Sequence, residues 1–452
     1  MMLKGSRVGM ARDNGSLCAL PWVHLNISPD GDTTLCCQTG IQLRADDGRP
    51  LNVQTHTLEA IWHSTAFKDV RRRMLAGERL EHCTACYRNE RNGWGSYRQV
   101  ANRQWLQEPN DSSEIGDIRL SIAELGLEQP EAPRYFDLRI GNLCNLKCVN
   151  CRSLYSSQIE RDPVQSKWNE SYFIRQKHRF AAIDEWYNAP EILEEIKGLS
   201  DNVVEIQLAG GEPTLNRILM GWLEWLCAEG KAAGIDVGLV TNLTNVSDRF
   251  YALLPHFRRI DVKISLDGYG AVYEYNRFPG KWSAIERNIA RLTGLKANYA
   301  VTIFPVMNVY NMLTLVDLFE WADRYGFPVS PSLVRSSDHV DCRLLPPAAR
   351  QEARRRFDSY LARRQEQVGS ETPGLVDLAR QVDLALAEIE ANDFTPQERA
   401  AKVRDFMEFT NDIDRHRGTS FRNTCPDTWR FMIEAHGSWH EGTRYLRPVA
   451  AT

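Results

Sequence analysis

Three cysteines in the segment GNLCNLKCVNCRS constrain this chain more than any other feature. Cys144, Cys148 and Cys151 form a CxxxCxxC array, which directly follows a β-rich run at residues 135–140. Three thiolates can bind three irons of a four-iron cluster and leave the fourth iron open to another ligand. A structural zinc site is the alternative, but such sites use four protein ligands, and no fourth Cys or His lies nearby in the sequence.

A second group of cysteines lies near the N-terminus. It consists of two pairs: Cys18, Cys36, Cys83 and Cys86. Two pairs supply four thiolates, which suit either zinc or a four-iron cluster, and their spacing does not choose between them. Cys37 is predicted to point away from Cys36 on an extended segment and to be a spare.

From residue 134 onward, short β-rich runs alternate with longer helix-like segments, which predicts an α/β fold with βα units around a parallel sheet. The candidate strands are 135–140, 203–209, 236–241, 260–266, 299–306 and 328–334.

The β signal ends at Pro346 and Pro347, and the rest of the chain is predicted to be helical. Thr395 and Glu398 form a capping box that starts one of these helices. The predicted organisation is therefore a cysteine-rich region over 1–115, an α/β region over 134–345 and a helical region over 346–452. The polar stretch between the first two regions is interpreted as a linker.

Two motifs together resemble the signature of radical S-adenosylmethionine (SAM) enzymes. One is the CxxxCxxC array after the first strand, and the other is LAGGEPTL at the end of the second strand. The resemblance implies a partial (β/α)6 barrel over 134–345. It further implies that the open iron chelates SAM, and that reductive cleavage of SAM yields a 5'-deoxyadenosyl radical that abstracts hydrogen from a substrate carbon.

The resemblance also implies which residues contact SAM. Gly210 and Gly211 would allow close backbone approach, and Glu212 would meet the SAM ammonium group. Ligands of such barrels gather where the strands end, so polar residues there are expected at the ribose and the carboxylate. These residues are Asn242, Ser265 and Arg277. Ordinary turn chemistry is the alternative interpretation of each of them.

The N-terminal pattern resembles the twitch domain, a half-size relative of the SPASM domain, which holds an auxiliary cluster. The matching features are Cys18, Gly31 and Cys36, followed after a gap by the pair at 83 and 86. Such domains usually follow the barrel, whereas here the motif precedes it. The implied cofactors are two 4Fe-4S clusters, one SAM-binding and one auxiliary, together with SAM.

Cys342 follows the sixth predicted strand, at the rim where a substrate would sit. A thiol there is a candidate catalytic residue that returns a hydrogen atom to a substrate radical, which would make the chain an epimerase. An ordinary loop cysteine is the alternative.

The resemblance implies oxidation, crosslinking or epimerisation of a peptide or small molecule, catalysed by an oxidoreductase or epimerase that receives electrons from flavodoxin or ferredoxin. Within this interpretation, a sugar or aminocyclitol dehydrogenase or epimerase stays open, because no leader-binding module is evident before Cys18. A different class is a zinc-binding interaction protein on a degenerate barrel, which predicts zinc, no iron and no SAM binding.

Charge and hydropathy argue against a nucleic-acid-binding, secreted or membrane protein. The formal net charge of −4 provides no overall positive field for nucleic acid. No apolar stretch is long enough for a signal peptide or a membrane span, so we expect a cytoplasmic protein without a membrane partner. Because a reducing cytosol disfavours disulfides, the 11 cysteines point to metal ligation, catalysis or burial.

Overall fold

The structure of the chain is a computed structural model that describes residues 15–91, 95–106, 120, 126, 130–168, 186–334 and 337–437. The chain divides into two compact units. Unit 1 consists of Met1–Gly141, Ala182–Gly238 and His256–Arg259, and unit 2 of Asn142–Ala181, Leu239–Pro255 and Ile260–Thr452.

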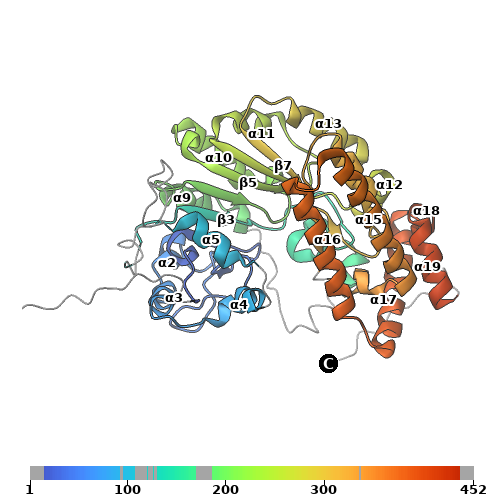
Figure 1. Cartoon of the computed structure of the whole chain (residues 1–452). Coiled ribbons are helices and arrows are strands. Elements are labelled where there is room, and N and C mark those ends of the chain that lie inside the picture. The colour runs from blue at the N-terminus through green and yellow to red at the C-terminus, as the bar shows by residue number, and fades with distance from the viewer. Residues whose placement is uncertain are drawn as a thin grey trace, which may run out of the picture. The chain divides into compact units, whose positions relative to one another are not determined.

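The central sheet has seven strands in the order β2-β1-β3-β4-β5-β6-β7 (Figure 1). Their bounds are β1 His24–Ile27, β2 Thr33–Thr34, β3 Tyr135–Leu138, β4 Glu205–Leu208, β5 Asp236–Thr241, β6 Arg259–Ile264 and β7 Tyr299–Ile303. β3 pairs in parallel with β1 and with β4, and β6 pairs in parallel with β7, whereas β2 is antiparallel to β1. The predicted α/β fold with a mostly parallel sheet is confirmed.

Unit 1 combines the N-terminal cysteine-rich segment with β3 and β4. The N-terminal segment adds β1 and β2 to the sheet, which the sequence pattern did not predict. Its helices are α1 Leu20–Val23, α2 Leu58–Trp62, α3 Thr65–Leu75, α4 Thr84–Arg91 and α5 Tyr97–Trp105. α9 (Pro190–Gly198) packs against α10 (Arg217–Ala228), and Trp222 of α10 meets the buried ring of Phe136 on β3 at 5.5 Å.

Unit 2 contains the cysteine loop after β3 and the later helices of the α/β region. These helices are α7 Ser157–Glu160, α11 Asp248–Leu253, α12 Gly270–Asn276, α13 Trp282–Thr293 and α14 Leu315–Asp323. The sixth predicted strand is reduced to β9 (Ser332–Leu333), which pairs with β8 (Val306–Met307) in a separate sheet. Pro328 and Pro331 explain this shortening, because neither can donate a backbone N–H to a ladder.

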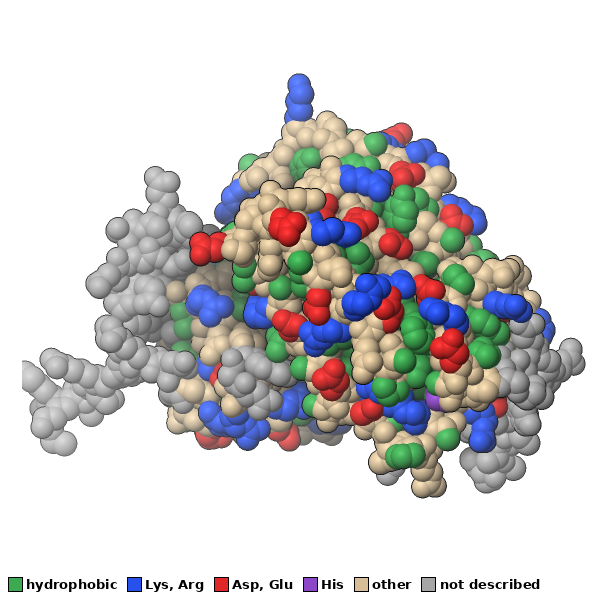
Figure 2. Space-filling model, turned by 45° about the vertical axis from the view of Figure 1, so that its right-hand side comes forward, with side chains coloured by type: hydrophobic (Ala, Val, Ile, Leu, Met, Phe, Trp, Pro, Cys, Tyr) green, Lys and Arg blue, Asp and Glu red, His purple; other side chains and the backbone are tan. Residues whose placement is uncertain are grey.

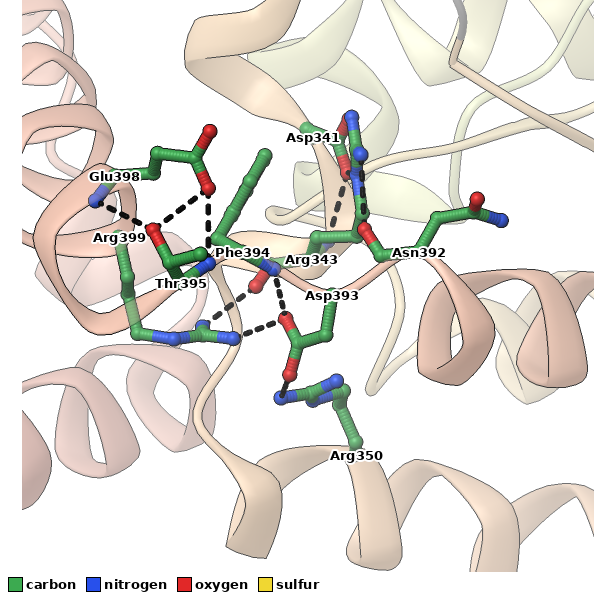
Figure 3. Close-up of polar contacts among 9 residues, drawn as sticks. All are labelled: Asp341, Arg343, Arg350, Asn392, Asp393, Phe394, Thr395, Glu398 and Arg399. Atoms are coloured by element: carbon green, nitrogen blue, oxygen red, sulfur yellow. Dashed lines mark hydrogen bonds and ion pairs between the residues drawn. The ribbon is translucent and has the colours of Figure 1, made fainter.

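The C-terminal region is helical, as predicted. It contains α15 Pro347–Val368, α16 Pro373–Ala391, α17 Pro396–Arg417, α18 Phe421–Thr424 and α19 Pro426–His436. The capping box of α17 has both expected bonds: Thr395 accepts from the Glu398 N–H, and the Glu398 side chain accepts from the Thr395 N–H (Figure 3).

Charged side chains of both signs are interspersed on the face shown in Figure 2. On α15, for example, Glu352 pairs with both Arg355 and Arg356 at 2.7 Å. None of the helices in the described part of the chain is both long and apolar enough to cross a lipid bilayer.

Candidate functional site

The three cysteines of the CxxxCxxC array lie together in unit 2. Cys144 and Cys148 belong to one buried apolar cluster with Leu146, and Cys151 packs against that cluster. The sulfurs therefore gather on one loop, as a shared iron cluster requires.

Local hydrogen bonds fix the shape of this cysteine loop. The Cys144 N–H donates to Ser157 Oγ (3.3 Å), and Ser156 Oγ donates to the Leu146 carbonyl (2.7 Å). The Cys151 N–H donates to the Cys148 carbonyl (3.1 Å). The Ser156–Ser157 pair at the start of α7 therefore stabilises the conformation of the cysteine loop.

Two of the predicted SAM-site residues direct donors at different sulfurs of the array. Asn242 Nδ2 lies 4.0 Å from Cys144 Sγ, and Arg277 Nη1 lies 3.9 Å from Cys148 Sγ. Donors near a sulfur stabilise its thiolate form, which is the form that binds metal. The donor set therefore fits a thiolate-ligated cluster.

Burial opposes thiolate formation in this loop. It raises the pKa of Cys148 and of Cys151 above the ordinary value, and in both cases Arg277 opposes the rise. Burial alone would lower the pKa of Arg277, but Asp267, at 2.9 Å from Arg277 Nε, and then Cys148 raise it. Arg277 thus stays a cation beside the sulfurs.

Asp267 is a further site residue, which the sequence placed among the polar residues at the end of the fourth predicted strand without selecting it as a SAM contact. Its signal was its position in SLDG, directly after β6. Its carboxylate accepts from the Val306 N–H (2.8 Å) and pairs with Arg277. Ser265 is half-buried in the same turn, and its own N–H donates to the Thr241 carbonyl (2.9 Å).

The GGE segment belongs to unit 1. Gly210 has a φ of +117°, and a Cβ there would lie 3.2 Å from the Arg139 Cα, so this position requires glycine. Gly211 follows it directly in the sequence. Glu212 is 2% exposed, and its Oε1 accepts from the Thr214 hydroxyl (2.7 Å) and the Thr214 N–H (3.3 Å). The carboxylate is therefore held in one orientation.

The four N-terminal cysteines all belong to unit 1, where they act on one another electrostatically. Burial, followed by Cys83 and Cys86, raises the pKa of Cys18 to about 12. Burial raises the pKa of Cys36 well above its ordinary value, with Cys37, Cys18 and Cys83 adding to the rise. Mutual repulsion of this kind is expected of thiols that converge on one metal group.

Arg98 is a buried cation beside this N-terminal set that no sequence signal marked. It is 2% exposed, pairs with Glu90 at 2.9 Å and donates to the Leu17 carbonyl at 2.7 Å. It acts electrostatically on both Cys18 and Cys83 in favour of their thiolates.

Cys342 begins the short helix η9 (Cys342–Leu344), which packs against α16 and α17. The side chain is 1% exposed, and burial raises its pKa well above the ordinary value. The neighbouring Asp341 is paired with Arg343 at 2.7 Å. The thiol is therefore kept in its protonated form.

No three His, Cys, Asp or Glu side chains lie close enough to hold a single metal ion, within the ranges that the structure describes.

Two family models match the chain. Residues 18–87 match the SPASM model, an iron-sulfur cluster-binding domain, and residues 138–322 match the model of the radical SAM superfamily. The SPASM domain lies on the N-terminal side of the radical SAM domain. No curated protein matches the chain.

Several solved structures are similar to part of the chain. SuiB from Streptococcus suis bound to S-adenosylmethionine is 13% identical, with a TM-score of 0.33, over 52% of this chain and 49% of SuiB. Histidine-tagged anSMEcpe with bound AdoMet is 17% identical, with a TM-score of 0.33, over 50% of this chain and 58% of that protein. The chain therefore covers less than two thirds of each of these proteins.

Proposed function

We propose that this chain, which matches the radical SAM superfamily over residues 138–322 and the iron-sulfur SPASM domain over residues 18–87, is a radical SAM enzyme that abstracts hydrogen from a carbon atom of a peptide or small molecule. In this family, the SAM-binding cluster supplies the electron that cleaves SAM to methionine and a 5'-deoxyadenosyl radical. One observation carries the assignment to this chain: Asn242 and Arg277 direct donors at two different sulfurs of the array.

We assign the SAM-binding cluster to Cys144, Cys148 and Cys151. Asn242 and Arg277 stabilise the thiolates, and Arg277 is fixed by Asp267. The remaining proposed SAM contacts are Gly210, Gly211, Glu212 and Ser265. The fixed carboxylate of Glu212 suits the SAM ammonium group, because an oriented carboxylate needs no reorganisation when it pairs with a cation.

We assign an auxiliary 4Fe-4S cluster to Cys18, Cys36, Cys83 and Cys86. A cluster with four thiolate ligands has no open iron, so its proposed role is to relay an electron or to shape the pocket. Buried Arg98 supplies a compensating positive charge. We further propose domain boundaries of 1–115, 134–345 and 346–452. The electron donor is proposed to be a flavodoxin or ferredoxin, and the protein is proposed to be cytoplasmic.

Epimerisation is one proposed net reaction, and it requires that the buried thiol of Cys342 contact the substrate. Burial keeps the Cys342 thiol protonated, and S–H is the form that donates a hydrogen atom. Oxidation without such a donor is the competing outcome. The Cys342→Ala variant separates the two, since it should still consume SAM but lose the inverted product. Unchanged turnover and unchanged product stereochemistry would remove Cys342 from the mechanism.

The test of the central proposal is an anaerobic assay. The full chain is purified without oxygen, reconstituted with iron and sulfide, and given SAM and a strong reductant while 5'-deoxyadenosine is measured. Cys148→Ala should abolish its formation, whereas the matched control Cys227→Ala, on half-buried Cys227 of α10, should not. Bound zinc, absent iron and intact SAM would instead support the zinc-binding interaction protein.

A further inference from the structure

The C-terminal end of α17 contacts the cysteine loop directly within unit 2. Arg417, the last residue of that helix, donates from Nη2 to the Lys147 carbonyl (2.7 Å) and to Gln165 Oε1 (2.6 Å). Gln165 Nε2 in turn donates to the Cys148 carbonyl (2.8 Å). One guanidinium therefore holds the carbonyls of two consecutive loop residues, one directly and one through Gln165.

The loop is also held by the C-terminal end of α12 and the residues that follow it. The Lys147 N–H donates to the Phe278 carbonyl (2.6 Å), and the Val149 N–H donates to the Asn276 carbonyl (2.9 Å). The Arg417 guanidinium also lies 5.1 Å from the centre of the Phe278 ring. The cysteine loop therefore forms hydrogen bonds with Asn276 and Phe278 as well as with α17.

A second contact joins α17 to the same loop. Asp162 is 1% exposed, and its carboxylate pairs with Lys147 Nζ at 2.8 Å. The same carboxylate lies 3.4 Å from His416 Nε2 on α17. The attachment therefore includes a polar network around Lys147 as well as the Arg417 hydrogen bonds.

Arg417 is not fully satisfied by these contacts. Its Nε and Nη1 are buried without hydrogen-bond partners. The charged or ionisable groups around it are Asp162, Tyr275, Cys148 and Tyr310. A buried cation with unused donors is costly unless negative charge accumulates nearby. The thiolates of a loaded cluster would provide that charge.

We propose that Arg417 is a positioning residue that ties the C-terminal helices to the cysteine loop and fixes Cys148 for cluster binding. This inference rests on the proposed function. It assigns a role in the site to α17, which lies beyond residues 18–87 and 138–322 that match the two family models.

The first test uses the metal-free full chain and needs no activity. Hydrogen exchange is measured for peptides covering residues 144–151 in the wild type, in Arg417→Gln and in Arg415→Gln. Arg415 is the matched control, because it is exposed on the same helix and pairs only loosely with Asp412 (3.5 Å). Arg417→Gln should make exchange of the loop roughly 10-fold faster, because charged hydrogen bonds are lost, and Arg415→Gln should not.

Gln165→Ala is a second variant that tests the proposal even if the Arg417 variant does not fold. It leaves the Arg417 bond to Lys147 in place and removes only the link to the Cys148 carbonyl. It should therefore give a smaller increase in exchange, confined to the loop, with unchanged exchange in α15. Equal exchange in all four proteins would overturn the proposal.

The second test uses the reconstituted protein. Removing the Arg417 charge should shift the midpoint potential of the SAM-binding cluster to more negative values, because the added electron loses a nearby cation. Arg417→Lys should leave the midpoint potential unchanged, because it retains the positive charge. It should still increase hydrogen exchange of the cysteine loop, because lysine lacks the planar guanidinium that bonds two acceptors at once. If the wild type binds no iron, the proposed function fails, while the metal-free exchange comparison still decides the role of Arg417.

Discussion

Thiols are buried in both cysteine sets, the CxxxCxxC array and the N-terminal set. Burial raises the pKa of Cys18, Cys36, Cys148 and other members of these sets. Metal binding must therefore displace protons from thiols that the fold keeps neutral. Buried guanidinium groups lower this cost at both sets: Arg98 acts on Cys18, and Arg277 acts on Cys148.

Asp30 gives a pH-dependent prediction. Burial and the neighbouring Asp32 raise its pKa from 3.8 to about 6. The folded state thus favours the neutral acid, so this stability is present below pH 3.8 and is lost as the pH rises through 6. Asp30→Asn should therefore be more stable than the wild type by about 1–2 kcal/mol at pH 8, and the difference should vanish near pH 4.

The measurement is the free energy of unfolding by denaturant at a series of pH values. Asp201→Asn is the control, since the Asp201 side chain is 80% exposed. A difference between Asp30→Asn and the wild type that does not change with pH would contradict the prediction.

Gly210 gives a backbone prediction. Alanine there must adopt a φ of +117° and place its Cβ 3.2 Å from the Arg139 Cα. Gly210→Ala should lower the free energy of unfolding by about 2–3 kcal/mol. Gly230→Ala is the control, because Gly230 also has a positive φ (+69°) but has open space around it. This variant should lower the free energy of unfolding by only about 1 kcal/mol. Equal losses in a denaturant titration would show that the close approach to Arg139 carries no cost.

At the scale of elements, the turn between α16 and α17 locks the start of α17. Asp393 pairs with Arg350 at 2.7 Å and also contacts Arg399 (Figure 3). The Phe394 ring lies 4.3 Å from the Arg343 guanidinium, and Arg399 donates to the Arg343 carbonyl at 2.7 Å. This turn therefore fixes α17 against η9, which contains Cys342.

Two threonines test how much the cap of α17 contributes. Thr395 makes a side-chain cap bond. Thr372, which also precedes a proline at the start of α16, makes no cap bond, and its hydroxyl donates only to the exposed Val368 carbonyl (2.8 Å). Thr395→Ala should lower the free energy of unfolding by about 1 kcal/mol, and Thr372→Ala by only a few tenths, roughly 0.3 kcal/mol. Denaturant titration of both variants decides this, and equal effects would refute it.

The sequence predicted elements wherever local chemistry determines them. The capping box of α17 and the first five strands after residue 134 are examples, because periodicity and caps are local signals. The sixth strand was predicted at full length, but Pro328 and Pro331 limit its pairing. β1 was missed because its four residues are all buried and so show no alternation.

At the scale of the whole molecule, contacts between distant segments could not be predicted. Arg417 lies 270 residues from Lys147, and Arg98 lies 81 residues from Leu17. No spacing rule links such positions, because only the fold brings them together. The sequence therefore predicted the cysteines and Arg277, but not the other buried cations that complete their surroundings.

The separate placement of the two cysteine sets predicts independent loading of two clusters. Cys18 and Cys83 belong to unit 1, whereas Cys148 belongs to unit 2, so removing ligands from one set should leave the other intact. The reconstituted wild type should hold about eight irons per chain. Cys83→Ala combined with Cys86→Ala should retain about four and still cleave SAM, and Cys148→Ala should retain about four and cleave none. Iron analysis with electron paramagnetic resonance checks this, and a wild type with only about four irons would mean that the N-terminal set holds something other than a four-iron cluster.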